Sequence, residues 1–309
     1  MADKRFDLVA FGEPLVELNQ TGQTGAYLPG FGGDTSNAAI AAARQGARVG
    51  YVTAVGADDF GDRFLDLWRA EGVDTAAVRR DPAAHTGMYF ISHGPRGHGF
   101  TYMRAGSAAS RMTPADLPED TIASARILHL SGITQAISPG ACDAGFAAME
   151  MARRHGVTVS YDSNLRLKLW PIDRARAIIH AALAGADVAL LSQEDAEALC
   201  GTADAGAILD RYCAMGPKVV VLKVGKEGAW IAAGGERRHI PGHAVAAVDA
   251  TGAGDTFAGA FLTEVAAGRD PFTAAAYANA AAALSTTGWG AVTPIPHRPA
   301  VEAFLAAVP

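Results

Sequence analysis

Short β-branched runs alternate with alanine-rich helical stretches along most of the chain, and this alternation constrains the fold more than any other feature. The runs expected to be strands are Val49–Val55, Arg126–Leu130, Val157–Tyr161, Asp187–Leu191 and Val219–Val224. Several of them are almost continuously apolar, which is typical of a strand covered on both faces. The pattern therefore predicts an α/β fold with a largely parallel central sheet and helices on both of its faces.

Four helices are predicted between these strands, each ended by a glycine. They are a helix capped by Thr35 or Ser36 that ends at Gly46, and helices over Asp59–Glu71, Pro139–His155 and Pro171–Ala184. A further stretch, Pro271–Pro296, carries no Lys, Arg, Asp or Glu. Because this stretch is mostly alanine, its hydrophobicity is too weak for a membrane span, and we expect a buried helix followed by a loop.

Two segments interrupt the alternation. Leu15–Gly33 shows no long helical pattern, and Met88–Arg104 is typical of two strands joined by a turn at His93–Gly99. We expect these extra antiparallel strands, over about residues 14–33 and 86–105, to form a small lid. No linker or low-complexity stretch divides the chain, so residues 1–309 are expected to form a single domain.

The charge balance limits the class of partner. The chain has 26 Lys and Arg against 32 Asp and Glu, a formal net charge of −6, so no positive excess is left to neutralise a nucleic-acid backbone. The three cysteines are scattered and form no CxxC pair, and the first residues lack the apolar region of a signal peptide. We therefore predict a cytoplasmic protein with no nucleic-acid or membrane partner.

The strongest local signal is the run from Val248 to Phe261, which contains Gly252-Ala253-Gly254-Asp255. A helical pattern follows Asp255, so the small residues lie at a helix N-terminus, where unpaired N–H groups and the helix dipole favour an anion. A carboxylate at this place can act as a general base toward a hydroxyl held beside a phosphate. The residues alone equally allow Asp255 to be an ordinary helix-start acid after a tight turn.

A second glycine-rich element, Gly30–Asn37, opens the first predicted helix. Paired glycines let the backbone approach a ligand, and Asn37 can both donate to and accept from sugar hydroxyls. Taken alone, this segment favours a plain loop with Ser36 as the helix cap. The sequence contains neither a Walker A loop nor a G-x-G-x-x-G fingerprint after a strand.

Together, Gly32-Gly33 and Asn37 with the distant Asp249–Asp255 block resemble the two signatures of the ribokinase (PfkB) family of carbohydrate kinases. The resemblance extends over nearly the whole chain. It implies a ribokinase-like three-layer α/β/α fold with a small β-strand lid, and an enzyme that uses ATP and Mg²⁺. It also implies that Asp255 is the catalytic base and that residues 252–254 form the anion hole for the transferring phosphate.

Within this family, the chain most resembles kinases that phosphorylate 2-keto-3-deoxygluconate at its 6-hydroxyl to give 2-keto-3-deoxy-6-phosphogluconate. The likeness is carried by Thr86–Tyr89, Tyr102–Ser110, Asp162–Arg166 and Leu169-Trp170. A guanidinium suits the carboxylate that a sugar acid carries and a neutral hexose lacks. The substrate-binding residues that the resemblance implies are Gly33, Asn37, Tyr89, Tyr102, Arg104, Arg166 and Asp255.

Two other functions stay open at this stage. One is a kinase of the same fold that acts on a neutral sugar, such as a fructokinase or a ribokinase. The other is a protein that binds a sugar acid without transferring phosphate, although the intact Asp255 speaks against it. Since lid strands often pair between subunits in this family, the resemblance also implies a homo-oligomer.

For the nucleotide, the resemblance implies a site built largely from backbone. Its residues are Ser192, Lys223, Gly225, Gly228, Gly252, Ala253, Gly254 and Asn279. The family's Asn-x-x-Glu, which organises magnesium through water, is replaced here by Ser192-x-x-Asp195. Asp195 is the implied magnesium residue, because Mg²⁺ keeps most of its water and needs few carboxylates. A monovalent-cation site near Asp249 and Thr251 is left open.

Overall fold

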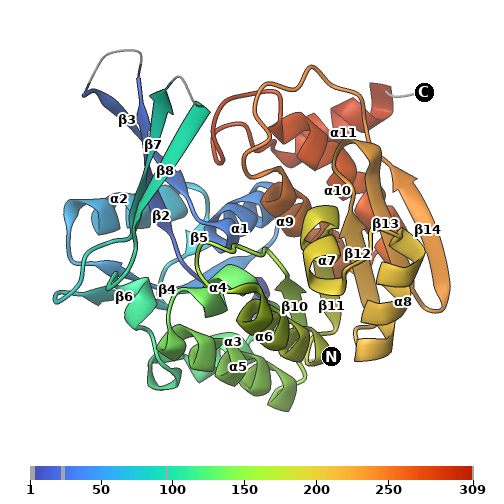
Figure 1. Cartoon of the computed structure of the whole chain (residues 1–309), viewed down its shortest axis with the longest axis horizontal. Helices are drawn as coiled ribbons and strands as arrows, with labels where there is room; N and C mark the ends of the chain where they lie inside the picture. Colours follow the sequence, from blue (N-terminus) through green and yellow to red (C-terminus); the bar gives the residue numbers. More distant parts are fainter. Residues whose placement is uncertain (1–3, 22–24, 95–96, 308–309) are drawn as a thin grey trace.

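The computed structural model describes residues 4–21, 25–94 and 97–307. Its strands form one large sheet and one small sheet, which lies apart from the large one at the upper left of Figure 1. The strands are β1 (Phe6–Phe11), β2 (Leu15–Gln20), β3 (Tyr27–Gly32), β4 (Val49–Gly56), β5 (Val73–Asp74), β6 (Val78–Asp81), β7 (Met88–Gly94), β8 (Gly97–Met103), β9 (Ala125–Ser131), β10 (Thr158–Asp162), β11 (Val188–Ser192), β12 (Val219–Lys223), β13 (Gly228–Ala233) and β14 (Glu236–Pro241).

The large sheet has ten strands in the order β14-β13-β12-β11-β10-β9-β1-β4-β5, with β6 also paired to β4. Pairing is parallel from β12 to β5, while β13 and β14 are antiparallel additions at one edge. In a parallel sheet all carboxyl ends lie on one side, and the loops that leave them meet there. The candidate site lies at that side.

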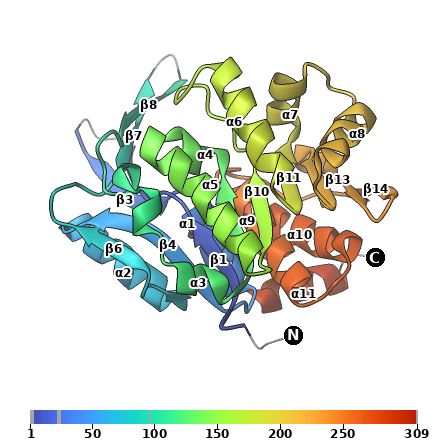
Figure 2. The ribbon, with the colours of Figure 1, turned by 90° about the horizontal axis from the view of Figure 1, so that it is seen from below.

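Helices cover both faces of the large sheet. They are α1 (Asp34–Arg44), α2 (Asp59–Ala70), α3 (Glu119–Ala123), α4 (Gly132–Ala136), α5 (Pro139–Arg154), α6 (Ile172–Ala184), α7 (Gln193–Cys200), α8 (Ala205–Met215), α9 (Ala253–Ala266), α10 (Pro271–Ser285) and α11 (Arg298–Ala307). One core packs α5, α6 and α8 on one face, and a second core packs α1, α2, α9 and α10 on the other, as Figure 2 shows.

The apolar runs of the sequence explain this two-sided burial. Along β1, Val9 and Phe11 enter one core while Leu8 and Ala10 enter the other, because successive side chains of a strand point to opposite faces. Every residue of β4 is buried. The predicted three-layer α/β/α fold with a largely parallel sheet is confirmed.

The small sheet has the order β3-β2-β7-β8. Its outer pairs are antiparallel as expected, but the central pair of β2 and β7 is parallel. The reason is topological: both strands leave the large sheet from its carboxyl side and run outward together. The predicted turn at His93–Gly99 is shortened, since β7 continues to Gly94 and β8 begins at Gly97; residues 95–96 lie outside the described residues.

One predicted helix cap is wrong. Helix α1 is capped by Gly33, with a φ of 106°, rather than by Thr35 or Ser36. Both hydroxyls lie inside the helix and serve buried aromatic side chains instead. The Thr35 hydroxyl lies 3.0 Å from the hydroxyl of Tyr51, and Ser36 accepts a 2.9 Å hydrogen bond from the indole of Trp68.

The uncharged Pro271–Pro296 stretch forms α10 and a loop, as predicted. In the part of the chain that the structure describes, no helix has the length and apolar character needed to cross a membrane.

Candidate active site

The N-terminus of α9 lies at the carboxyl side of the large sheet and carries Asp255 in its first turn. Gly252 is the cap, with a φ of 76°, and a side chain there would begin 2.9 Å from the carbonyl oxygen of Ala291. Glycine is therefore required at this position, both for the left-handed backbone and for the close approach. The resulting helix end offers unpaired backbone N–H groups to an anion.

Asp255 is held by α1. The side-chain amide of Asn37 donates a 2.8 Å hydrogen bond to Oδ2 of Asp255. The Oδ1 atom of Asn37 is buried and has no hydrogen-bond partner among the residues that the structure describes. The two helices approach closely because Gly259 has no side chain: a Cβ there would lie 2.3 Å from the carbonyl oxygen of Ala38. A small residue on α9 thus sets the spacing between Asn37 and Asp255.

The environment of Asp255 raises its pKa to about 7. Burial is the largest cause, and the nearby carboxylates of Asp34 and Asp162 add to it, while the Asn37 hydrogen bond and the Lys223 ammonium oppose it. A carboxylate with a pKa near the operating pH suits general-base chemistry, because it is ionised in part and still basic.

A cavity of about 420 Å³ opens above Asp255, between the carboxyl side of the large sheet and the small sheet. Eight of the site residues predicted from the sequence line this cavity: Gly33, Asn37, Tyr89, Tyr102, Arg104, Arg166, Gly252 and Asp255. They come from the first helix, the small sheet, the segment after β10 and the start of α9, which are far apart in the sequence. Asp249 and Thr251 also line it.

Arg104 lines the cavity, but its positive charge is paired within the protein. Its guanidinium forms a buried ion pair with Glu13, and it lies 5.5 Å from the centre of the Tyr102 ring. Burial raises the pKa of Glu13, and the Arg104 charge opposes that rise. Within the described part of the chain, the buried Nε atom of Arg104 has no hydrogen-bond partner, so this side chain keeps a donor for another group.

Sequence reasoning missed several cavity residues. Glu13 and Glu17 flank the start of β2, and Glu17 accepts a hydrogen bond from the Tyr89 hydroxyl, whose pKa is raised by burial and then by the Glu17 charge. Asp34 accepts a 2.8 Å hydrogen bond from the amide of Asn164. Asn164 has a φ of 27°, the one positive value outside glycine among the described residues. A signal was present, since Glu13 lies two residues after the end of β1 and Asp34 directly follows the paired glycines.

Lys223 lies beside the N-terminus of α9. Its ammonium donates a 2.6 Å hydrogen bond to Asp162, and a Cβ on Gly254 would lie 3.5 Å from the same Nζ atom. Burial opposes the charge on Lys223, but the carboxylates of Asp162, Asp255 and Asp195 outweigh it and raise its pKa. An anion at the start of α9 therefore meets both helix N–H groups and a protonated lysine.

Ser192 and Asp195 form one turn at the start of α7. The Ser192 hydroxyl accepts a hydrogen bond from the Asp195 N–H, so Ser192 is a helix cap. In the described part of the chain, both hydrogen bonds to the Asp195 carboxylate, from the Ser163 hydroxyl and the Leu165 N–H, end on Oδ2. Burial raises the pKa of Asp195. The second oxygen is left for water, which fits a cation held through its hydration shell.

The other predicted nucleotide residues lie outside the cavity. Gly225 and Gly228 have positive φ values of 60° and 103° around the turn between β12 and β13. The Asn279 amide donates to the carbonyl oxygens of Ile240 and Pro241, so it ties α10 to the end of β14. Among the described residues, no group of three or more His, Cys, Asp or Glu is placed to hold a metal ion.

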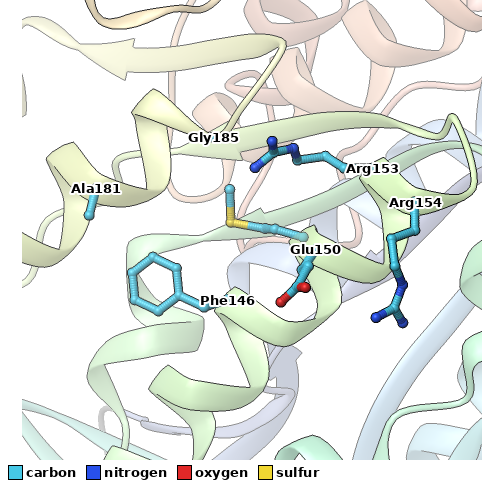
Figure 3. Close-up of a pocket in the computed structure, with 7 residues that line it drawn as sticks. Phe146, Glu150, Arg153, Arg154, Ala181 and Gly185 are labelled. Atoms are coloured by element: carbon cyan, nitrogen blue, oxygen red, sulfur yellow. The ribbon is translucent and has the colours of Figure 1, made fainter.

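A second hollow, of about 630 Å³, lies between α5 and the end of α6 (Figure 3). Phe146, Glu150 and Arg153 project from α5 on one side, and Gly185 follows α6 on the other. These segments lead into the amino ends of β10 and β11, opposite the side where ligands bind in open parallel sheets. It contains no predicted site residue, so the cavity above Asp255 is the candidate active site.

Comparison with known proteins agrees with this geometry. The family model described as pfkB family carbohydrate kinase matches residues 6–298. A 2-dehydro-3-deoxygluconokinase of Thermoproteus tenax is 37% identical over 293 residues, which cover 92% of this chain and 89% of the relative. One from Bacillus subtilis is 34% identical, covering 98% and 96%, and a fructokinase of Klebsiella pneumoniae is 35% identical, covering 93% and 95%.

The chain belongs to the pfkB family of carbohydrate kinases. It is therefore a kinase with a carbohydrate acceptor, and the ribokinase-like fold expected from the sequence is confirmed. Solved structures support this assignment. The fructokinase of Vibrio cholerae O395 with fructose, ADP and calcium bound has a TM-score of 0.87 and 31% identity, covering 97% of this chain and 99% of the other. The ATP-bound fructokinase of Xylella fastidiosa has a TM-score of 0.90 and 26% identity, covering 97% and 98%.

Proposed function

We propose that this pfkB-family enzyme phosphorylates 2-keto-3-deoxygluconate, also called 2-dehydro-3-deoxygluconate, at its 6-hydroxyl with ATP. The observation that carries the proposal is that one cavity is lined by Asp255, whose pKa is raised to about 7, and by the arginines Arg104 and Arg166. The Asp255 carboxylate suits a hydroxyl acceptor, and the Arg166 guanidinium suits the carboxylate of a sugar acid. Arg104, paired with Glu13, keeps a hydrogen-bond donor for another polar group of the sugar. The relatives from Thermoproteus tenax and Bacillus subtilis that bear this activity in their names support the same substrate.

In the proposed reaction, Asp255 accepts the proton of the 6-hydroxyl as that oxygen forms a bond to the terminal phosphorus of ATP. The bond between this phosphorus and the bridging oxygen breaks, and ADP leaves with the electron pair. Backbone N–H groups at Gly252 and Gly254, with Lys223 beside them, stabilise the charge on the transferring group. Ala253 shapes this end of the helix, since its N–H donates a 3.2 Å hydrogen bond to the carbonyl oxygen of Ala250. Asn37 orients Asp255 through its 2.8 Å hydrogen bond.

Mg²⁺, when bound with the nucleotide, supplies positive charge to the phosphate oxygens. Asp195 is the proposed contact to the hydration shell of this Mg²⁺. Its backbone N–H donates to the Ser192 hydroxyl, and one oxygen of its carboxylate is left for water. Gly225, Gly228 and Asn279 are proposed to shape the nucleotide site, Asn279 indirectly by anchoring the end of β14. We also propose that the small sheet acts as the lid of a single kinase domain.

A neutral-sugar kinase is the second candidate. It is favoured by the fructokinase relative at 35% identity and by the carboxylates that line the cavity, two of which, Glu13 and Glu17, lie near Arg104 and Tyr89. Sugar hydroxyls donate hydrogen bonds to such carboxylates without charge repulsion.

The two candidates separate in an ADP-release assay with ATP, Mg²⁺ and a panel of 2-keto-3-deoxygluconate, gluconate, fructose and ribose. The proposal expects kcat/KM for 2-keto-3-deoxygluconate to exceed that for fructose by at least about tenfold, which is the size of one well-placed charge contact. A preference for fructose or ribose contradicts the sugar-acid assignment. No ADP release with any sugar, while 2-keto-3-deoxygluconate still binds, identifies a non-catalytic binder.

A further inference from the structure

Four basic side chains line the cavity: His93, Arg104, Arg166 and Lys168. Two of them are already engaged by the protein. Arg104 is paired with the buried Glu13, and the Nε2 atom of His93 lies 2.7 Å from the side-chain oxygen of Asn19. Arg166 and Lys168 form no ion pair with any residue that the structure describes. The cations that remain for an anionic ligand therefore both lie in the segment that follows β10.

That segment is anchored on both sides of the two cations. Leu165 and Trp170 are buried, and the Leu165 N–H donates to Asp195. Between them, the Leu169 N–H donates a 2.9 Å hydrogen bond to the carbonyl oxygen of Arg166, which closes a tight turn. Lys168 thus stands in a turn held by buried neighbours, so its Cα position is defined although its side chain is exposed.

Lys168 faces the small sheet across the cavity. Its Nζ atom lies 5.7 Å from the centre of the Phe100 ring, and Phe100 is itself stacked on Tyr102 with an interplanar angle of 16°. Aromatic rings exclude water from one side of the ammonium group and leave its charge unneutralised. A lysine in this place attracts an anion more strongly than one fully surrounded by water.

The cavity lining is rich in carboxylates, so an anionic substrate needs a nearby cation to bind there. Five carboxylates line the cavity: Glu13, Glu17, Asp34, Asp249 and Asp255. Because Glu13 neutralises Arg104, a substrate carboxylate placed at Arg104 would meet a pair with no net charge and gain hydrogen bonds only. The same carboxylate placed at the turn after β10 would meet Arg166 and Lys168, which have no ion-pair partner among the described residues.

We propose that Lys168 is a second ligand of the substrate carboxylate, that it acts together with Arg166, and that it determines the preference for sugar acids over neutral sugars. The proposal rests on the sugar-acid function proposed above. Arg104 then contributes neutral hydrogen bonding at the other side of the substrate, and the carboxylate points to the turn at residues 166–169.

The test compares Lys168→Met, Lys168→Arg and the wild type in steady-state assays with 2-keto-3-deoxygluconate and with fructose. Methionine keeps the length and apolar stem of lysine but removes the charge. We expect KM for 2-keto-3-deoxygluconate to rise about tenfold in Lys168→Met with kcat within about twofold, as for loss of one partly shielded charge contact. Lys168→Arg should restore KM to within about threefold, and fructose kinetics should change in neither variant.

The matched control is Lys218→Met, which removes the same charge from an exposed lysine paired with Asp187 at the amino end of β12. It should leave both KM values unchanged. The rise in KM for Lys168→Met should also shrink as salt is raised from about 0.05 to 0.5 M, because added ions screen the contact.

The outcomes separate the two proposals. A wild type that prefers fructose overturns the sugar-acid function itself, before any variant is considered, and with it the role of Lys168. A wild type that prefers 2-keto-3-deoxygluconate, together with an unchanged KM in Lys168→Met, overturns the role of Lys168 alone. An equal loss of kcat/KM on both sugars also overturns it, because that result indicates a structural role.

Discussion

The two walls of the cavity differ in burial and in the way their side chains are held. On the side of the large sheet, Asp255 and Asn37 are joined by a hydrogen bond and come from two helices packed in the core. On the small sheet, Tyr102 and Phe100 are 40% and 44% exposed, and their partners are mainly other rings. The first wall holds its polar groups through buried hydrogen bonds, whereas the rings of the second wall are partly open to solvent.

Because of this difference, we expect substitutions on the helix side of the cavity to reduce activity or stability more than substitutions on the small sheet. Buried polar groups with defined partners lose function or stability when they are altered, because no solvent is present to replace the lost contact. Substitution of an exposed aromatic side chain costs little function or stability, because water and neighbouring rings replace the lost contacts. Four predictions test the contrast, from the largest effect to the smallest.

Asp255→Asn removes the proposed base and keeps the shape of the side chain. We expect kcat to fall about 10³-fold with little change in KM, since general-base catalysis contributes in that range. Steady-state ADP release measures both values. Asp66→Asn, at an exposed acid on α2, is the control and should behave as the wild type. A kcat within tenfold of the wild type would show that another group takes the proton.

Gly259→Ala places a methyl group 2.3 Å from the carbonyl oxygen of Ala38 and must push α1 away from α9. We expect a loss of about 1–3 kcal/mol in the free energy of unfolding, as for other overpacked cores, and a lower kcat because Asn37 moves from Asp255. Urea unfolding and kinetics measure the two effects. Gly99→Ala on β8 is the control, because the nearest atoms of the described residues, on Ser92, would lie 4.0 Å from its Cβ. Equal stability of the two variants contradicts the close-packing argument.

The activity should depend on pH through Asp255, whose pKa is raised to about 7. A base acts in its deprotonated form, so kcat/KM should be constant above this pKa and fall about tenfold per pH unit below it. Asp34→Asn removes a negative neighbour that raises the pKa, and the acidic limb should shift to lower pH. If the acidic limb of the kcat/KM profile has the same pKa in Asp34→Asn as in the wild type, the titrating group is not Asp255.

Tyr102→Phe removes a hydroxyl from the small sheet at a side chain that is 40% exposed. We expect KM for the sugar to change by less than about threefold, because water replaces an exposed hydrogen bond at little cost. The same assay at saturating ATP measures it. A tenfold rise would show that the small sheet contacts the substrate as specifically as the helix side does, and the contrast between the walls would fail.

The order of elements was predictable from the sequence, since apolar runs and glycine stops depend on local physics. The predicted strand Val49–Val55 is β4 over Val49–Gly56, and the predicted helix Pro139–His155 is α5 over Pro139–Arg154. The cap of α1 was wrong because Thr35 and Ser36 are used by Tyr51 and Trp68, and such partners come from distant parts of the chain.

The α/β architecture, the glycine-rich start of α9 and the acid at that place follow from the amino-acid sequence. The pairing of charged groups becomes visible only in the folded structure. The fold placed Glu13 against Arg104 and Asp34 near Asp255, and it brought Arg166 and Lys168 to the cavity with no ion pair to any residue in the described ranges. The physical reason is that periodicity and caps act over a few residues, whereas burial and charge pairing depend on which distant segments the fold brings together.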